Sequence, residues 1–213
     1  MRLLIPFCIL LALAGCCCKS NTKSNELTRF YEDGRAKPII AIPSMIDSSS
    51  CDLSWSLSEE LTSMIVRKIS DSGSVCVISG DDLSFSGNPF SSDLSWMKRE
   101  FCDHEFAAFV ELVEHEMVPV NSSVEVPFET AMNLKMAMRL RVVDLRGSTP
   151  QIVLQEMVRD TYYIPRNQIP VDYKVVVWGD GEYNSSPMGI AHVQLVQEVS
   201  TRIKEYLHLA KSR

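Results

Sequence analysis

The sequence has no excess of basic residues, and this excludes one large class of partners. Its 213 residues include 21 Lys and Arg against 27 Asp and Glu, which gives a net charge of −6. Because proteins bind the phosphate backbone of nucleic acid through Lys and Arg, we expect no nucleic-acid partner. The 9 Gly and 10 Pro are also too few for a fibrous or low-complexity chain, so a single globular domain with a sizeable core is expected.

The sequence also lacks the motifs that mark common catalytic and metal sites. It has no Gly-x-Ser-x-Gly elbow, no Walker loop and no Gly-x-Gly-x-x-Gly turn. No spacing among its four His residues would place two metal ligands on one face of an element; they are His104, His115, His192 and His208. We therefore predict no enzymatic activity, no metal and no cofactor. We expect His104 and His208 to be solvated at the surface.

Long apolar runs are absent beyond the first residues, where Leu3 to Leu13 follows a short cationic start. A run of this length is too short to cross a membrane, which takes about 20 helical residues, but it fits the core of a secretory signal. The next residues, Leu13-Ala14-Gly15-Cys16, resemble the bacterial lipobox. The resemblance implies that residues 1–15 are a lipoprotein signal peptide and that Cys16 becomes the lipidated N-terminus. A plain signal peptide or an uncleaved anchor is the alternative.

Lipidation of Cys16 would fix where the mature chain resides. Two or three acyl chains, such as palmitate, exceed what stable membrane anchoring requires. The polar residues that follow predict a flexible tether over 16–37, with Phe30 and Tyr31 as candidates to dock on the domain. In enterobacteria an Asp after the lipidated Cys retains a lipoprotein in the inner membrane, and here Cys17 stands at that place. We therefore expect the outer membrane, facing the periplasm, although other lineages sort differently.

Five Cys residues remain beyond the lipobox, an odd number that prevents complete pairing within the chain. Cys76 stands in a Val-Cys-Val-Ile run and is expected to be a buried thiol. A disulfide between Cys51 and Cys102 is allowed in an oxidising compartment, but the sequence does not fix its geometry. For Cys17 and Cys18, further acylation, crosslinking to neighbours and no role all stay open.

The periodicity of apolar residues predicts a mixed α/β fold. A short apolar run, a helix with a capping box and a second apolar run indicate a parallel βαβ unit. A second helix then leads into three segments that alternate with period two, which indicates an antiparallel meander before a C-terminal helix. The order β-α-β-α-β-β-β-α packs helices on a central mixed sheet in one domain, residues 38–213. The predicted strands are 39–42, 75–78, 106–113, 132–143 and 151–163, and the predicted helices are 55–70, 92–103 and 188–210.

An insertion at 164–187, between the last strand and the last helix, is rich in turn residues and aromatic residues. It holds Tyr173, Trp178 and Tyr183. Because Trp and Tyr are enriched at interface hot spots, these three residues are the candidate contacts to a partner. The oxygen-bearing run from Asp180 to Asn184 is interpreted as a turn, since it lacks the later bidentate Glu of a calcium loop.

Five segments carry a resemblance to known proteins. They are Lys37-Pro38-Ile39-Ile40-Ala41-Ile42-Pro43, the helix Leu57 to Thr62, Val75-Cys76-Val77-Ile78-Ser79 with Asp82-Leu83, Arg141-Val142-Val143-Asp144, and Ile152 to Glu156. Their order behind a lipobox resembles a set of bacterial envelope proteins. The set includes the penicillin-binding-protein activator lipoprotein, the curli-secretion channel lipoprotein and the N-terminal domain of the Tol translocation protein. The resemblance implies a domain that binds other proteins and has no catalytic centre.

These observations predict a lipid-anchored periplasmic protein that acts as a non-catalytic protein-binding or assembly module. It would contact another envelope protein, of unknown identity, through its sheet edges and the 164–187 insertion; self-association stays open. The alternative is a subunit of an outer-membrane export pore. Strands that cross a membrane need an apolar lipid-facing side, whereas the 132–143 strand exposes Lys135, Arg139 and Arg141, which favours the module.

Overall fold

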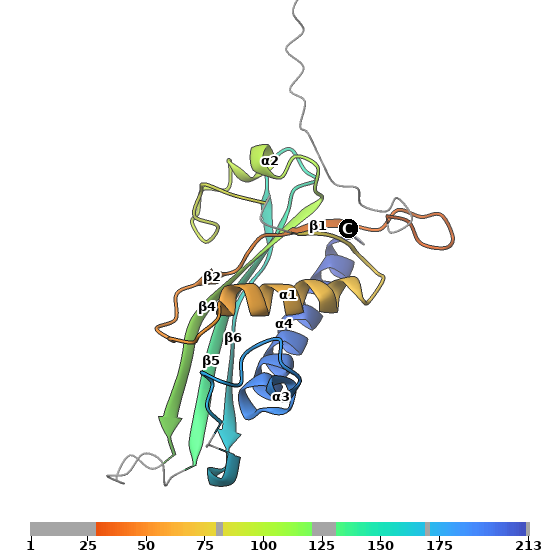
Figure 1. Cartoon of the computed structure of the whole chain (residues 1–213). Coiled ribbons are helices and arrows are strands. Elements are labelled where there is room, and N and C mark those ends of the chain that lie inside the picture. Colours follow the sequence, from red (N-terminus) through yellow and green to blue (C-terminus); the bar gives the residue numbers. More distant parts are fainter. Residues whose placement is uncertain (1–28, 80–82, 121–130, 169–170, 212–213) are drawn as a thin grey trace, which may run out of the picture.

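A six-stranded mixed sheet with helices packed against it forms the fold (Figure 1). The computed structural model describes residues 29–79, 83–120, 131–168 and 171–211. The strands are β1 (Ile39–Ile42), β2 (Ile46–Asp47), β3 (Cys76–Ser79), β4 (Phe106–Pro119), β5 (Met132–Asp144) and β6 (Gln151–Ile164). The helices are α1 (Leu57–Ser70), α2 (Met97–Glu100), α3 (Gly181–Ser185) and α4 (Pro187–Lys211), with a 3-10 turn at Arg166–Gln168. The predicted α/β class is confirmed.

The sheet joins a parallel part to an antiparallel part. β1 lies between β3 and β4 and runs parallel to both, so β1, α1 and β3 form the predicted βαβ unit. β4, β5 and β6 follow one another as the predicted antiparallel meander. β2, which lies outside the predicted strands, pairs over two residues in parallel with β4. Among the described strands β6 pairs only with β5, so its 14 residues form an edge of the sheet.

α1 and α4 lie together on one face of the sheet (Figure 1). α1 begins at a cap, because the Ser56 side chain accepts a hydrogen bond from the Glu59 backbone N–H at 3.2 Å. α4 begins at Pro187, whose ring already has a helical φ angle. Both helices bury a stripe at helical spacing, and each fully buried Leu or Ile contributes about 1.5–3 kcal/mol. The stripes are Leu57, Leu61, Ile65 and Ile69 on α1 and Leu195, Val199, Ile203 and Leu207 on α4.

The segment from Leu83 to Phe101, with α2, covers part of the opposite face. The helix predicted over 92–103 is much shorter, because Asp93 forms a local turn. Its Oδ1 accepts hydrogen bonds from the backbone N–H and hydroxyl of Ser95 at 2.9 and 2.7 Å, a pattern that competes with helix. His104, expected at the surface, packs edge-on against the Phe101 ring, and both of its ring nitrogens are buried. The expectation for His104 was therefore wrong.

A bulge in β4 decides which side chains reach the helices. The register against β5 shifts between Leu112 and Glu114, so Val113 is an extra residue. Up to Leu112 the even-numbered residues join the core under α1 and α4, as the alternation predicts. After the bulge this face is taken by odd-numbered residues, which places His115 beneath α4.

The first described residues form a small hairpin that contacts the turn before β3. Phe30 and Ala36 pair as an antiparallel bridge, and the Tyr31 hydroxyl donates a hydrogen bond to the Ser74 carbonyl at 2.7 Å. The far end of the expected tether therefore lies on the domain. Within the described part of the chain no helix is long and apolar enough to span a membrane.

The cysteines of the domain do not form the disulfide that the sequence allowed. Cys51 is a half-buried free thiol, so the Cys51–Cys102 pair is absent. Burial, together with the charges of Asp47 and Asp52, raises the pKa of the Cys51 thiol to about 11. Cys76 is buried in β3, as predicted. Cys17 and Cys18 lie outside the described residues.

Candidate functional site

The three candidate contact residues of the insertion have different environments. Tyr173 and Trp178 are half-buried and pack against the main core. The Tyr173 hydroxyl accepts a hydrogen bond from the Met188 backbone N–H at 3.3 Å, which holds the insertion on the start of α4. Tyr183, in α3, is only 2% exposed. Its side chain therefore offers a partner almost no surface, in contrast to the exposed contact that the sequence suggested. Cys16, the predicted lipidation site, lies outside the described residues.

Tyr183 belongs to a buried polar cluster that the sequence did not reveal. Its hydroxyl donates to Glu60 Oε1 at 2.6 Å, and Trp55 Nε1 donates to Glu60 Oε2 at 2.8 Å. His192 Nδ1 lies 2.8 Å from both Glu60 Oε1 and the Tyr183 hydroxyl. His192 Nε2 lies 2.8 Å from His115 Nε2. Glu60 and His192 are fully buried, so α1, α3, α4 and β4 meet at one closed network.

The hydrogen-bond partners assign the protons of this cluster. Glu60 only accepts and Tyr183 donates its hydrogen to Glu60, so His192 Nδ1 must carry a proton. Burial alone would raise the pKa of Glu60, but its bonds to His192, Tyr183 and Trp55 outweigh that effect and lower the pKa. The carboxylate therefore stays ionised beside the imidazole.

His115 joins the buried cluster through its hydrogen bond to His192. Burial, and then the neighbouring His192, lower the pKa of His115 from 6.5 to about 4. Its Nδ1 has no hydrogen-bond partner in the part of the chain that the structure describes. A positive charge on His115 would be buried, away from solvent, with its Nε2 2.8 Å from the His192 ring, so burial favours the neutral form of His115.

Sequence reasoning missed this cluster for identifiable reasons. His115 and His192 are 77 positions apart, and only the β4 bulge turns His115 toward α4. One signal was present: Glu60 falls on the same helical face as Leu57 and Leu61, where a charged residue needs a buried partner. The cluster is buried, and its hydrogen bonds join α1, α3, α4 and β4.

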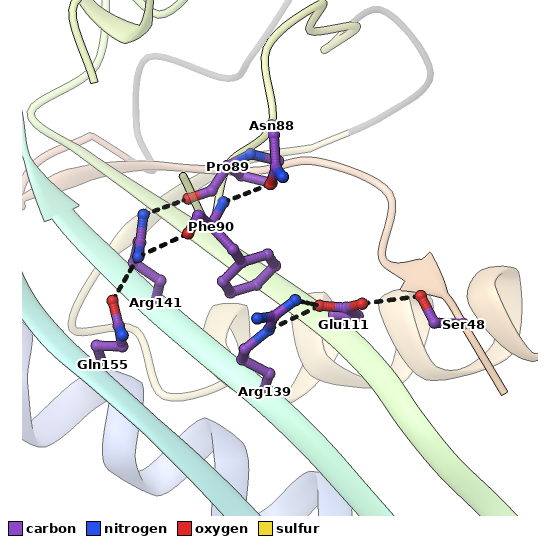
Figure 2. A network of polar contacts seen from close by, with 8 residues as sticks. All are labelled: Ser48, Asn88, Pro89, Phe90, Glu111, Arg139, Arg141 and Gln155. Carbon is purple, nitrogen blue, oxygen red and sulfur yellow. Dashed lines mark hydrogen bonds and ion pairs between the residues drawn. The ribbon is translucent and has the colours of Figure 1, made fainter. Parts of the chain in front are cut away.

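A second polar network fastens the segment before α2 to the opposite face of the sheet (Figure 2). The Arg141 guanidinium, 4% exposed, donates to the carbonyls of Pro89, Phe90 and Ser91 at 2.8, 3.1 and 2.6 Å, and to Gln155 Oε1. These bonds satisfy a buried cation and three carbonyls at once, so the network positions a loop.

Arg139 extends the same network toward β2. It is paired with Glu111, whose other carboxylate oxygen accepts from the Ser48 hydroxyl at 2.8 Å (Figure 2). Its guanidinium carbon lies 4.2 Å from the centre of the Phe90 ring, a cation–π contact. Sequence reasoning left Arg139 and Arg141 exposed on β5, yet Arg141 is buried and Arg139 is ion-paired.

A hollow of about 330 Å³ opens between α1 and α4, beside the insertion. Its apolar wall consists of Met64, Trp178, Tyr183, Val193 and Val196, and its polar rim of Ser63, Arg67, Lys68, Asp71 and Asn184. Val193 of α4 is 50% exposed at this hollow. Trp178 and Arg67 also line a second hollow, of about 470 Å³, on the neighbouring side of α1. Trp178 is therefore the one predicted contact residue that faces open space on two sides.

Comparisons with known proteins match the chain to a family without an assigned role. The family model described as a family of unknown function, DUF7499, matches residues 26–211. None of the curated proteins matches the chain. The resemblance to the activator, curli and Tol proteins therefore stays a prediction.

Several solved structures are similar to this chain to different degrees. The hypothetical protein CT253 from Chlamydia trachomatis has a TM-score of 0.64 and 23% identity, over 80% of this chain and 98% of that one. Protein XCC0632 from Xanthomonas campestris has a TM-score of 0.47 and 11% identity, over 83% and 88%. Lipoprotein GNA1162 from Neisseria meningitidis has a TM-score of 0.40 and 9% identity, over 79% and 99%. The likeness to CT253 extends over nearly the whole of that chain and concerns the fold alone.

Proposed function

The chain belongs to DUF7499, a family of unknown function, so the family gives no role. We propose a function from the chain's own residues. In this proposal it is a lipid-anchored protein of the bacterial envelope that acts as a non-catalytic protein-binding or assembly module. The observation that carries the proposal is that the buried cluster of acidic and basic side chains is closed to solvent. Glu60, Tyr183 and His192 are sealed inside the domain and bonded to one another, while Trp178 lies at an open surface hollow.

The lipid anchor in this proposal rests on Leu13-Ala14-Gly15-Cys16. Acyl chains on Cys16 would hold the domain at a membrane through a short polar linker. Cys17 in place of Asp supports the outer membrane, and the periplasmic side is the face proposed.

Replacing Cys16 with Ser tests the anchor. We expect the wild-type chain to incorporate labelled palmitate and to sediment with the membrane fraction, and the C16S variant to lose both properties. C17S is the matched control, because it removes a neighbouring thiol without altering the lipobox Cys. Equal labelling and equal sedimentation of wild type and C16S would refute the anchor.

Crosslinking in the native envelope tests the binding role. We expect one or a few envelope proteins to be captured at stoichiometric levels, and purified lipidated protein to turn over no envelope substrate at enzymatic rates. Turnover at ordinary rates would overturn the non-catalytic assignment. Stable rings in detergent with conductance in bilayers would instead support the export-pore subunit.

A further inference from the structure

The hollow between α1 and α4 has the size and the lining of a binding site. Its volume of about 330 Å³ falls within the range of natural ligand pockets, which are mostly apolar with a few placed polar groups. Trp178, Met64 and Val193 supply the apolar surface. Arg67 and Lys68 supply two cations at the rim, against one acid, Asp71.

The apolar surface continues outside the hollow. Val193 and Ile190, three positions apart on α4, are 50% and 47% exposed. Contiguous apolar surface beside a hollow is typical of a site that another molecule covers. An occupant would therefore bring an apolar side chain of its own.

The walls of the hollow are held rigidly. Tyr183, which forms part of the wall, is bonded to Glu60 of α1 and to His192 of α4. α3 and α4 also approach so closely that a Cβ atom on Gly189 would lie 2.1 Å from the Tyr183 carbonyl oxygen. A preformed site loses little conformational entropy on binding, so a ligand can bind it through a small contact area.

The charges at the rim select the occupant. The chain is acidic overall, but this rim carries Arg67 and Lys68. Arg67 is paired only loosely with Asp71, at 4.0 Å, and both side chains are largely exposed. Exposed pairs of this kind contribute little, so Arg67 is available to a carboxylate from outside.

We propose that this hollow binds a peptide segment of an envelope partner in which an acidic side chain stands beside a large apolar one. The apolar side chain packs on Trp178 and Val193, and the carboxylate pairs with Arg67 and Lys68. The inference rests on the proposed protein-binding function and assigns that function to one site.

A photo-crosslinking amino acid at position 178 of the full-length chain in its native envelope tests the assignment. Position 163 is the matched control, because Tyr163 is 63% exposed at the end of β6, outside the lining of the hollow. We expect adducts at 178, mapped by mass spectrometry to a segment with adjacent acidic and apolar residues. Adducts at 163 alone would overturn the hollow and leave the protein-binding function standing. No adduct at either position would overturn both.

Charge reversal supplies the second test. A synthetic peptide with the captured sequence should bind the full-length chain at least about tenfold more weakly when R67E and K68E are introduced together. The control R99E/R159E reverses two exposed cations elsewhere and should leave binding unchanged. Circular dichroism and thermal unfolding verify that each variant is folded. Binding that survives R67E/K68E, or a captured segment without a carboxylate, would refute the site.

Discussion

Acid should destabilise this domain through His104 and His115, because burial lowers the pKa of both, and His115 has the larger shift. His115 is 4% exposed, and burial beside His192 lowers the pKa of its imidazole to about 4, against 6.5 in an unfolded chain. A group whose pKa is depressed by folding stabilises the fold fully above the unfolded pKa, and this stability is lost as pH falls toward the folded pKa. The free energy of unfolding should therefore drop by about 2 kcal/mol between pH 7 and pH 5, and by about 3 kcal/mol when titration is complete.

Urea denaturation at pH 7, 6 and 5 measures this effect on a soluble chain that begins at Lys19. The variant H115Q replaces the imidazole with an amide that does not titrate but still offers polar atoms to His192. H208Q is the matched control, because His208 is exposed on α4. Wild type and H208Q should lose about 2 kcal/mol over this range, whereas H115Q should lose much less. An equal loss in all three proteins would falsify the assignment of the buried cluster.

Three further substitutions test other parts of the structure. Gly189→Ala places a Cβ atom against the Tyr183 carbonyl and should cost about 2 kcal/mol or more, measured as a lower Tm, while Gly181→Ala meets no atom within 4 Å and is the control. Tyr183→Phe removes a donor from the buried carboxylate and should cost about 1–3 kcal/mol in urea unfolding. Arg141→Leu leaves buried carbonyls unsatisfied and should make the Pro89–Ser91 segment a site of limited proteolysis, which Arg159→Leu should not. Unchanged digestion of Arg141→Leu would contradict the role of the network in Figure 2.

The elements that the sequence predicted best are those set by local periodicity. The Ser56 cap and the Leu57–Ile69 stripe define α1, and strict alternation defines β5. The helix predicted over 92–103 was wrong over most of its length. The Asp93 side chain hydrogen-bonds the backbone of its own turn, and this turn takes the place of the first part of the helix. Local hydrogen bonds of this kind are decided by geometry that periodicity does not report.

The candidate site could be predicted only in part. Trp178 and Tyr183 were both predicted from their aromatic residue type. Trp178 faces the hollow, whereas Tyr183 is buried. The difference lies in the partner of each side chain: Tyr183 meets a carboxylate from α1, a contact over 123 positions of sequence. Likewise, a single extra residue, Val113, reverses the direction of every later side chain in β4. The position of such a bulge cannot be predicted from amino-acid composition.

The position of β1 has a mechanical consequence for an anchored chain. The hairpin that starts at Arg29 leads directly into β1, and β1 is an internal strand with parallel neighbours on both sides. Tension from a lipid at Cys16 would therefore act along β1, so the hydrogen bonds to β3 and β4 would be loaded together in shear and would not open one after another from an edge. If Cys16 carries lipid as proposed, the pulling force would therefore enter the domain through an internal strand and not through an edge strand.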